Sequence, residues 1–303
     1  MNNRLHVLFR GSLTSCNYGC HYCPFALRRE TVEEQRQDRA GLQAFVDWIK
    51  AQEHREWGIL FTPWGEALVR SWYREAMVEL SHLPHVSRVA CQTNLSCSLK
   101  WLRNANRKAL ALWVSFHPTQ CTLERFVNRI KRLTDDGIRL SVGAVGIREH
   151  FGLLEELRNA LPSEIYFWIN AHKSDGQSYT EDEVKFLKGL DPLVEWNLHR
   201  YPSLGEGCHA GETSFTVDGR GDMRRCHFID SVVGNIADKG WEAALRERKC
   251  SNDTCGCHIG YVNLKKLGLS RTYGEGLLER IPVDRSPPPT PAVRKYLTRS
   301  KDS

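Results

Sequence analysis

Short apolar runs alternate with amphipathic, helix-like patterns six times between Leu5 and Leu190, and this alternation limits the chain to an α/β fold. The apolar runs are Leu5–Phe9, Gly58–Pro63, Val86–Asn94, Leu110–Pro118, Ile138–Ile147 and Ile165–Ala171. The helix-like patterns are Gly41–Gln52, Ser71–Leu83, Ser98–Lys108, Thr122–Gly137, His150–Leu161 and Thr180–Leu190. Because the runs are apolar almost throughout, they fit parallel strands buried on both faces. Six units are too few for a closed eight-unit barrel, so the pattern predicts a partial barrel or a doubly wound sheet.

Three cysteines, Cys16, Cys20 and Cys23, follow the first predicted strand with the spacing CX3CX2C. In either α/β fold the active site lies at the carboxyl ends of the strands, which is where this loop begins. Three thiolates can bind three irons of a [4Fe–4S] cluster and leave the fourth iron open for a non-protein ligand. The structural alternative is a zinc site completed by His21 or by a distant residue.

Composition and charge bear on the compartment and on the partners. The 303 residues include 11 cysteines, without a signal peptide and without the roughly 18 consecutive apolar residues of a membrane helix. The net charge is +6, and the basic runs Arg103–Lys108 and Arg129–Arg132 lie in helical patterns without interleaved aromatic residues. We therefore expect a cytoplasmic protein with no membrane or nucleic-acid partner. Because disulfides are rare in the cytosol, the cysteines are expected to serve metal or redox chemistry.

The cysteine loop resembles the signature of the radical SAM superfamily, in which an aromatic residue, here Tyr22, precedes the third cysteine. The "PWGE" that ends the second predicted strand is similar to the family's GGE motif, with Trp64 in place of the first glycine. The resemblance spans Leu5 to Leu190 and implies a partial (β/α)6 TIM-type barrel. It also implies a [4Fe–4S] cluster whose open iron is chelated by S-adenosylmethionine (AdoMet), and a reductant such as flavodoxin or ferredoxin.

The same resemblance gives AdoMet-binding roles to residues at the strand ends. Gly65 and Glu66 match the positions that receive the amino group of AdoMet, and a carboxylate suits an ammonium as a charge-assisted acceptor. Ser115 stands where the family often places a ribose contact. Val145 and Gly146 match the segment that contacts the adenine.

Two further polar residues, Asn94 and His117, end the third and fourth predicted strands and are expected to face the pocket. His117 suits acid–base chemistry or a substrate contact, and a hydrogen-bonded loop histidine is the structural alternative.

A second group of cysteines follows the predicted barrel: Cys208, Cys226, Cys250, Cys255 and Cys257. Cys208 and Cys226 flank a predicted hairpin with strands Thr213–Asp218 and Met223–Phe228. Their CX12GX4C spacing resembles the opening of SPASM and twitch extensions, which carry auxiliary iron–sulfur clusters. Five cysteines are fewer than a complete SPASM pattern has, so the resemblance implies one twitch-like auxiliary [4Fe–4S] cluster. A structural zinc site would suit the same thiolates.

These patterns predict three parts: a radical SAM core at residues 1–200, a twitch-like extension at 201–284 and a flexible Pro-rich, basic tail at 285–303. The predicted function is an enzyme that cleaves AdoMet to a 5′-deoxyadenosyl radical and abstracts hydrogen from a small molecule or a peptide. Since the first strand begins near Leu5, we expect no peptide-recognition domain before it. The alternative is a zinc or iron–sulfur protein that binds a ligand or transfers electrons without cleaving AdoMet.

Overall fold

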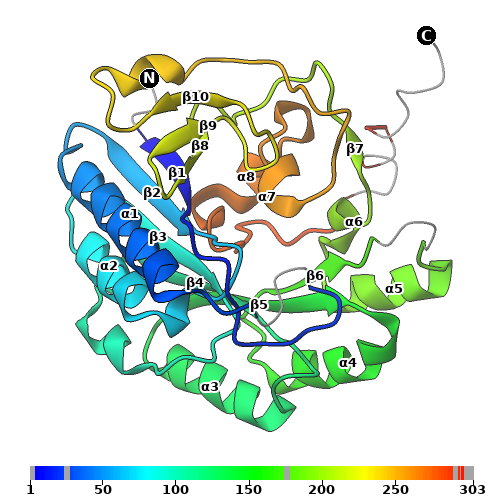
Figure 1. The fold of residues 1–303 in the computed structure, drawn as a ribbon. Coiled ribbons are helices and arrows are strands. Elements are labelled where there is room, and N and C mark those ends of the chain that lie inside the picture. The colour runs from blue at the N-terminus through cyan, green and yellow to red at the C-terminus, as the bar shows by residue number, and fades with distance from the viewer. Residues whose placement is uncertain (1–3, 24–27, 174–177, 289–292, 294, 297–303) are drawn as a thin grey trace.

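The computed structural model describes residues 4–23, 28–173, 178–288, 293 and 295–296. Six parallel strands form a continuous part of its sheet that reaches one edge, each hydrogen-bonded to the next along the chain. They are β1 (Arg4–Arg10), β2 (Glu56–Phe61), β3 (Val86–Thr93), β4 (Leu110–Ser115), β5 (Arg139–Gly146) and β6 (Phe167–Ala171). All six coincide with the predicted apolar runs, and the curved sheet in Figure 1 confirms the α/β fold and the partial barrel.

Five helices cover the outer face of this sheet (Figure 1). They are α1 (Val32–Lys50), α2 (Ser71–Ser81), α3 (Leu123–Asp135), α4 (Phe151–Ala160) and α5 (Glu181–Leu190). Side-chain caps begin three of them, because Thr31, Thr122 and Thr180 each accept a hydrogen bond from a backbone amide of the first helical turn. The helices bury one apolar side against the outward-facing strand residues, which form the larger hydrophobic core.

Two of the predicted helices differ from the structure. The first helix begins at Val32 rather than Gly41, because Thr31 and Glu34 form a capping box and start a polar first turn that carries no apolar period. The helix predicted at Ser98–Lys108 is wrong, since only a 3-10 turn forms at Lys100–Asn104. There the side chains of Ser98 and Asn106 bond backbone amides two residues further on, which competes with helix formation.

The C-terminal segment extends the same sheet beyond β1. After α6 (Val194–Asn197) and β7 (Tyr201–Pro202), strand β8 (Ser214–Asp218) pairs in parallel with β1. β9 (Asp222–Arg224) and β10 (Val232–Asn235) continue antiparallel, so that nine strands of the described residues form one sheet. The predicted hairpin is present, but its second strand ends at Arg224, and Cys226 lies in the turn that follows. The sheet therefore continues across the proposed boundary at residue 200.

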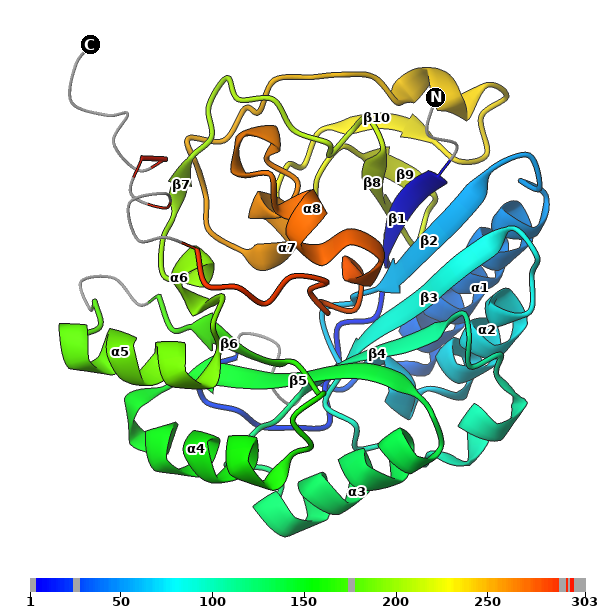
Figure 2. The ribbon, with the colours of Figure 1, turned by 180° about the vertical axis from the view of Figure 1, so that it is seen from behind.

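The inner face of the barrel is filled by the last part of the chain. β11 (Thr254–Cys255) pairs with β7, and α7 (His258–Tyr261) and α8 (Leu269–Tyr273) follow it. Figure 2 shows α7 and α8 on the concave face, opposite α1 to α5. A second hydrophobic core forms there from inward-facing strand residues and residues of these short helices. The concave face of the sheet is thereby packed by the C-terminal part of the chain.

Two further sequence expectations concern the C-terminal tail and membrane-spanning helices. Part of the predicted tail, residues 289–292, 294 and 297–303, lies outside the described residues, whereas Val293 is fully buried in the inner core. No helix in the described part of the chain combines the length and the apolar character that a bilayer crossing requires.

Candidate functional site

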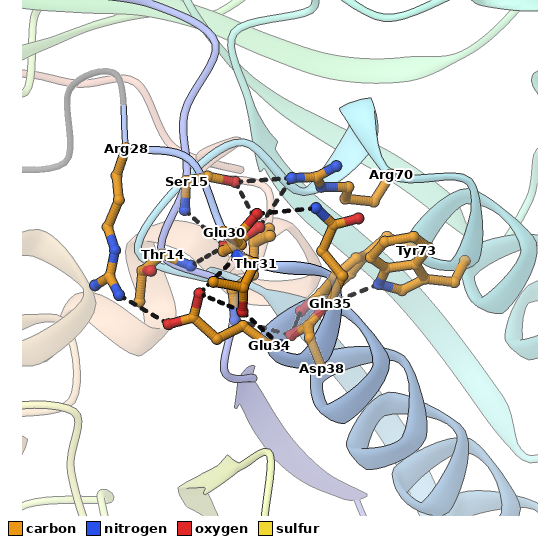
Figure 3. Close-up of polar contacts among 12 residues, drawn as sticks. Thr14, Ser15, Arg28, Glu30, Thr31, Glu34, Gln35, Asp38, Arg70 and Tyr73 are labelled. Carbon is orange, nitrogen blue, oxygen red and sulfur yellow. Dashed lines mark hydrogen bonds and ion pairs between the residues drawn. The ribbon is translucent and has the colours of Figure 1, made fainter.

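The loop that carries Cys16 is held by the buried carboxylate of Glu30 (Figure 3). This carboxylate accepts hydrogen bonds from the amides of Thr14 and Ser15 at 2.7 and 2.9 Å, and from the Ser15 hydroxyl at 2.8 Å. Arg70 pairs with it at 2.9 Å, and the Glu30 side chain is only 2% exposed. Because one charged group binds both amides directly before Cys16, the start of the loop has a fixed backbone.

Asp38 of α1 anchors the same loop one residue earlier. Its carboxylate accepts hydrogen bonds from the Leu13 amide at 2.8 Å, the Trp72 indole at 2.8 Å and the Tyr73 hydroxyl at 3.0 Å. Burial raises the pKa of this carboxyl, and the three donors oppose that shift. Asp38 thus ties the loop to both α1 and α2.

Gly65 of the "PWGE" turn packs directly on the cysteine loop. A Cβ atom at this position would lie 1.7 Å from the carbonyl oxygen of Ser15. The next amide, that of Glu66, donates to the same carbonyl at 3.0 Å. Only glycine allows the two backbones to approach this closely, which gives Gly65 a physical role in docking the turn against the residue before Cys16.

Glu66 is buried at the carboxyl ends of β2 and β3. Its carboxylate accepts from the Thr93 hydroxyl at 2.7 Å and from the amides of Asn94 and Leu68 at 2.6 and 3.1 Å. Burial raises the pKa of Glu66 to about 7, although these three donors lower it. The Asn94 side chain lies 3.9 Å from the Cys16 sulfur, so Gly65, Glu66, Asn94 and Cys16 form one contiguous group.

The three N-terminal thiols share one electrostatic environment. Burial, and to a smaller extent the charges of Glu66, Cys23 and Cys20, raises the pKa of Cys16 to about 11. Burial also raises the pKa of Cys20, which is 2% exposed. No three His, Cys, Asp or Glu side chains within the described ranges already stand in a metal-binding arrangement. Soft thiolates on one braced loop suit an iron–sulfur cluster, and its binding would release their protons.

Tyr22 and His117 lie beside these thiols. The Nδ1 atom of His117 is 2.9 Å from the Tyr22 hydroxyl and 3.3 Å from the Cys20 sulfur, and the two rings are stacked. Burial lowers the pKa of His117 to about 4, so the imidazole is neutral at physiological pH. His117, two residues beyond the end of β4, is therefore a neighbour of the cysteine loop.

Three other predicted residues lie at the same end of the barrel without a described contact to the cysteine loop. Ser115 is the last residue of β4, and Val145 and Gly146 end β5. The Gly146 carbonyl accepts a hydrogen bond from the Tyr179 hydroxyl at 2.6 Å. Their roles toward AdoMet stay predictions.

The five C-terminal cysteines line one cavity of about 380 Å³, although they are far apart in the sequence. Burial raises the pKa of Cys255, and the thiolates of Cys226, Cys208, Cys250 and Cys257 raise it further, in that order. Cys208 is buried, three others are half-buried and Cys257 is exposed. The fold thus gathers five soft sulfur donors around one cavity.

Basic side chains surround this cysteine cavity. Lys173, Arg200 and Arg225 line it, and burial lowers the pKa of Lys173 to about 8. Arg225 is 4% exposed, yet its Nε and Nη2 atoms have no hydrogen-bond partner within the described part of the chain. Buried guanidinium donors without acceptors suit sulfur atoms of an anionic metal–thiolate group.

Sequence reasoning missed Glu30, Asp38 and Arg225. Glu30 and Asp38 lie in the polar stretch before and within α1, where the sequence shows no motif. The capping pair Thr31 and Glu34 was the available signal that a helix begins there.

Comparison with solved structures gives the fold an independent reference. The structure of native anSMEcpe with bound AdoMet and Cp18Cys peptide is similar to this fold, with a TM-score of 0.53 and 15% sequence identity over 80% of either chain. Native anSMEcpe with bound AdoMet and Kp18Cys peptide has a TM-score of 0.53 at 14% identity, again over 80% of either chain. This likeness shows that the chain has the fold of these AdoMet-bound structures. No family model and no curated protein sequence matches the chain.

The bracing of the cysteine loop by Glu30 is testable by hydrogen exchange. Glu30→Ala leaves two buried amides and Arg70 without their acceptor, so we expect the Thr14 and Ser15 amides to exchange at least about tenfold faster. Glu33→Ala is the matched control, because Glu33 is an exposed residue of the first turn of α1. Unchanged protection of Thr14 and Ser15 in Glu30→Ala would show that the loop is held by other contacts.

Proposed function

We propose that this chain is a radical SAM enzyme, which binds a [4Fe–4S] cluster through Cys16, Cys20 and Cys23 and cleaves AdoMet reductively. The observation that carries the proposal is the contiguous group at the loop. Gly65 docks on Ser15, and the Glu66 carboxylate binds the Asn94 amide, whose side chain adjoins Cys16. A cluster with one open iron, when reduced, supplies the electron that breaks the sulfonium–C5′ bond of bound AdoMet.

The residues of the chain have separate tasks in this reaction. The three thiolates hold the metal and leave one coordination position for the amino and carboxylate groups of AdoMet. Glu66 accepts a hydrogen bond from the amino group, since a carboxylate that is already fixed by three donors needs no reorganisation to accept it. Asn94 positions this carboxylate through its amide. Ser115, Val145 and Gly146 are assigned to the ribose and the adenine.

The C-terminal cysteine cavity is assigned to an auxiliary [4Fe–4S] cluster of the twitch type. The ligands are proposed to come from the five cysteines that line this cavity, with Cys208 and Cys226, which carry the CX12GX4C spacing, among them. Burial raises the pKa of the Cys257 thiol, and the charges of Lys173, Arg280 and Arg10 lower it. Arg225 and Lys173 stabilise the negative charge of the bound group.

The substrate is a small molecule or a peptide from which the 5′-deoxyadenosyl radical abstracts hydrogen. The electron comes from a protein reductant such as flavodoxin or ferredoxin. A cluster held by the C-terminal cysteines would supply one-electron redox chemistry to the same barrel. Zinc, which has no redox chemistry, would not serve this role.

Replacement of all three N-terminal cysteines by alanine tests the assignment of the first cluster. We expect the variant to lose about four irons per chain and all 5′-deoxyadenosine production, because no loop ligand is left. The remaining iron should still give a reducible iron–sulfur signal from the C-terminal site. Production of 5′-deoxyadenosine by this variant would refute the assignment, and zinc in place of iron would refute the auxiliary cluster.

The Glu66→Gln variant tests the proposed contact between the Glu66 carboxylate and the amino group of AdoMet. Because burial raises the pKa of Glu66 to about 7, more of this group is carboxylate as the pH rises, and wild-type affinity for AdoMet should increase from about pH 6 to about pH 8. The neutral amide should bind AdoMet about tenfold more weakly above pH 7, without this pH dependence and with unchanged iron content. Equilibrium dialysis under anaerobic conditions measures the affinity of each protein at each pH, and metal analysis measures the iron content.

The Glu79→Gln variant is the control for the Glu66 experiment, since Glu79 lies on the surface of α2 and pairs there with Lys50 of α1. Equal affinities of wild type and Glu66→Gln at every pH would restrict Glu66 to its structural role at the end of β2.

A further inference from the structure

A second cavity, of about 820 Å³, opens where β1 and β8 end. It lies between the start of the cysteine loop, α1 and the hairpin of β8 and β9, and Arg10, Trp64 and His227 line it. The hairpin is fixed over α1 by close backbone packing, since a Cβ on Gly41 would lie 2.2 Å from the Gly219 carbonyl oxygen. The cavity is therefore bounded by parts of the chain that are held in place.

Arg10 presents a buried cation to this cavity. Its Nε atom donates to the Thr62 carbonyl at 3.2 Å, and its guanidinium carbon lies 3.5 Å from the centroid of the Trp64 ring. Its Nη1 atom is buried without a hydrogen-bond partner, and no carboxylate within the described ranges forms an ion pair with Arg10. Burial lowers the pKa of Arg10 to about 9, and the charge of the Cys257 thiolate opposes this shift.

His227 adds a second unsatisfied group on the same wall. Its ring is stacked with Trp64 at 6.2 Å and 19°, and both ring nitrogens are buried without a partner in the described structure. In a neutral imidazole one of these nitrogens is a hydrogen-bond donor and the other an acceptor. Buried donors on Arg10 and His227 thus frame the ring of Trp64, which is 39% exposed.

The two other arginines of this cavity already have carboxylate partners, and Asp230 is an exposed carboxylate of the lining. Arg224 pairs with Asp218 at 2.7 Å, and Arg220 lies 3.9 Å from Asp218 and 3.5 Å from Asp222. Arg10 is the cation of the cavity wall that lacks a carboxylate within the described residues, so one negative charge would complete its balance.

We propose that this cavity is the substrate site and that Arg10, Trp64 and His227 bind an anionic group of the substrate, a carboxylate or a phosphate. Arg10 offers a planar donor pair to the anion, His227 adds one donor, and the exposed part of the Trp64 ring is an apolar contact for the adjoining part of the molecule. The inference that the bound molecule is a substrate rests on the proposed radical chemistry, whereas the anion site itself does not depend on it.

The place of Trp64 in the sequence connects this cavity with the AdoMet site. Trp64 directly precedes Gly65, which docks on the cysteine loop, and it replaces the first glycine of the similar GGE motif. His227 faces this cavity, whereas its neighbour Phe228 lines the cysteine cavity. An anion bound at Arg10 would therefore lie between the two cysteine groups and outside the ligand set of either.

Arginine labelling of the reconstituted full-length protein tests the proposal. Phenylglyoxal labelling of Arg10, followed by mass spectrometry, should be roughly tenfold slower in malonate or inorganic phosphate than in chloride of equal ionic strength. Arg220 is the internal control, because it lines the same cavity but is 77% exposed, and its labelling should change less than about twofold. Slowing by only one of the two anions identifies the anionic group as carboxylate or phosphate.

Three results would overturn the assignment. They are equal labelling of Arg10 in all three salts, equal slowing of Arg10 and Arg220, and slowing of Arg10 by AdoMet alone, which would give the anion to the cofactor. A binding measurement is independent of labelling: malonate should raise the melting temperature of the wild type and of Arg220→Gln, but not of Arg10→Gln. Anion binding at Arg10 in a protein that never cleaves AdoMet would refute the radical function and leave the anion site intact.

Discussion

The buried carboxylate of Glu30 is the interaction on which the arrangement of the site depends. It binds the amides of Thr14 and Ser15 and thereby fixes the backbone from which Cys16 projects. The Ser15 carbonyl, on the other side of the same residue, receives the Glu66 amide and leaves room only for a glycine at position 65. The loop after β1 and the turn after β2 are therefore two halves of one rigid unit, and a ligand of this unit would meet preformed geometry.

The parallel pairing of β8 with β1 has a comparable importance for the C-terminal part. It extends the barrel sheet, and the cysteines of the C-terminal part line one cavity. Basic residues then occupy two different environments. Arg225 and Lys173 surround the cysteine cavity, whereas Arg10 faces the cavity beside Trp64. The separation of these cations suits two anionic ligands, one of them a metal–thiolate group and the other a substrate.

Much of this architecture could be predicted from the sequence, because six apolar runs with turn signals between them specify parallel strands directly. The cysteine spacing and "PWGE" also identified residues that the fold brings together. The sequence could not show that Glu30 and Asp38 hold the cysteine loop, since isolated carboxylates in a polar stretch have no period. The union of β8 with the barrel was missed for a similar reason: local patterns predict a hairpin, but strand order depends on long-range pairing. Arg10 and His227 emerged only from their unsatisfied buried nitrogens.

The central claim is that the braced three-cysteine loop holds a cluster with one open iron that AdoMet occupies. Electron paramagnetic resonance of the reduced, reconstituted protein before and after addition of AdoMet tests this claim most directly. We predict that AdoMet changes the g-values of one iron–sulfur signal, because it becomes a ligand of that iron, and leaves the signal of the auxiliary cluster unchanged. A spectrum that does not respond to AdoMet would show that every cluster is closed, and would leave an electron-transfer or binding protein as the better account.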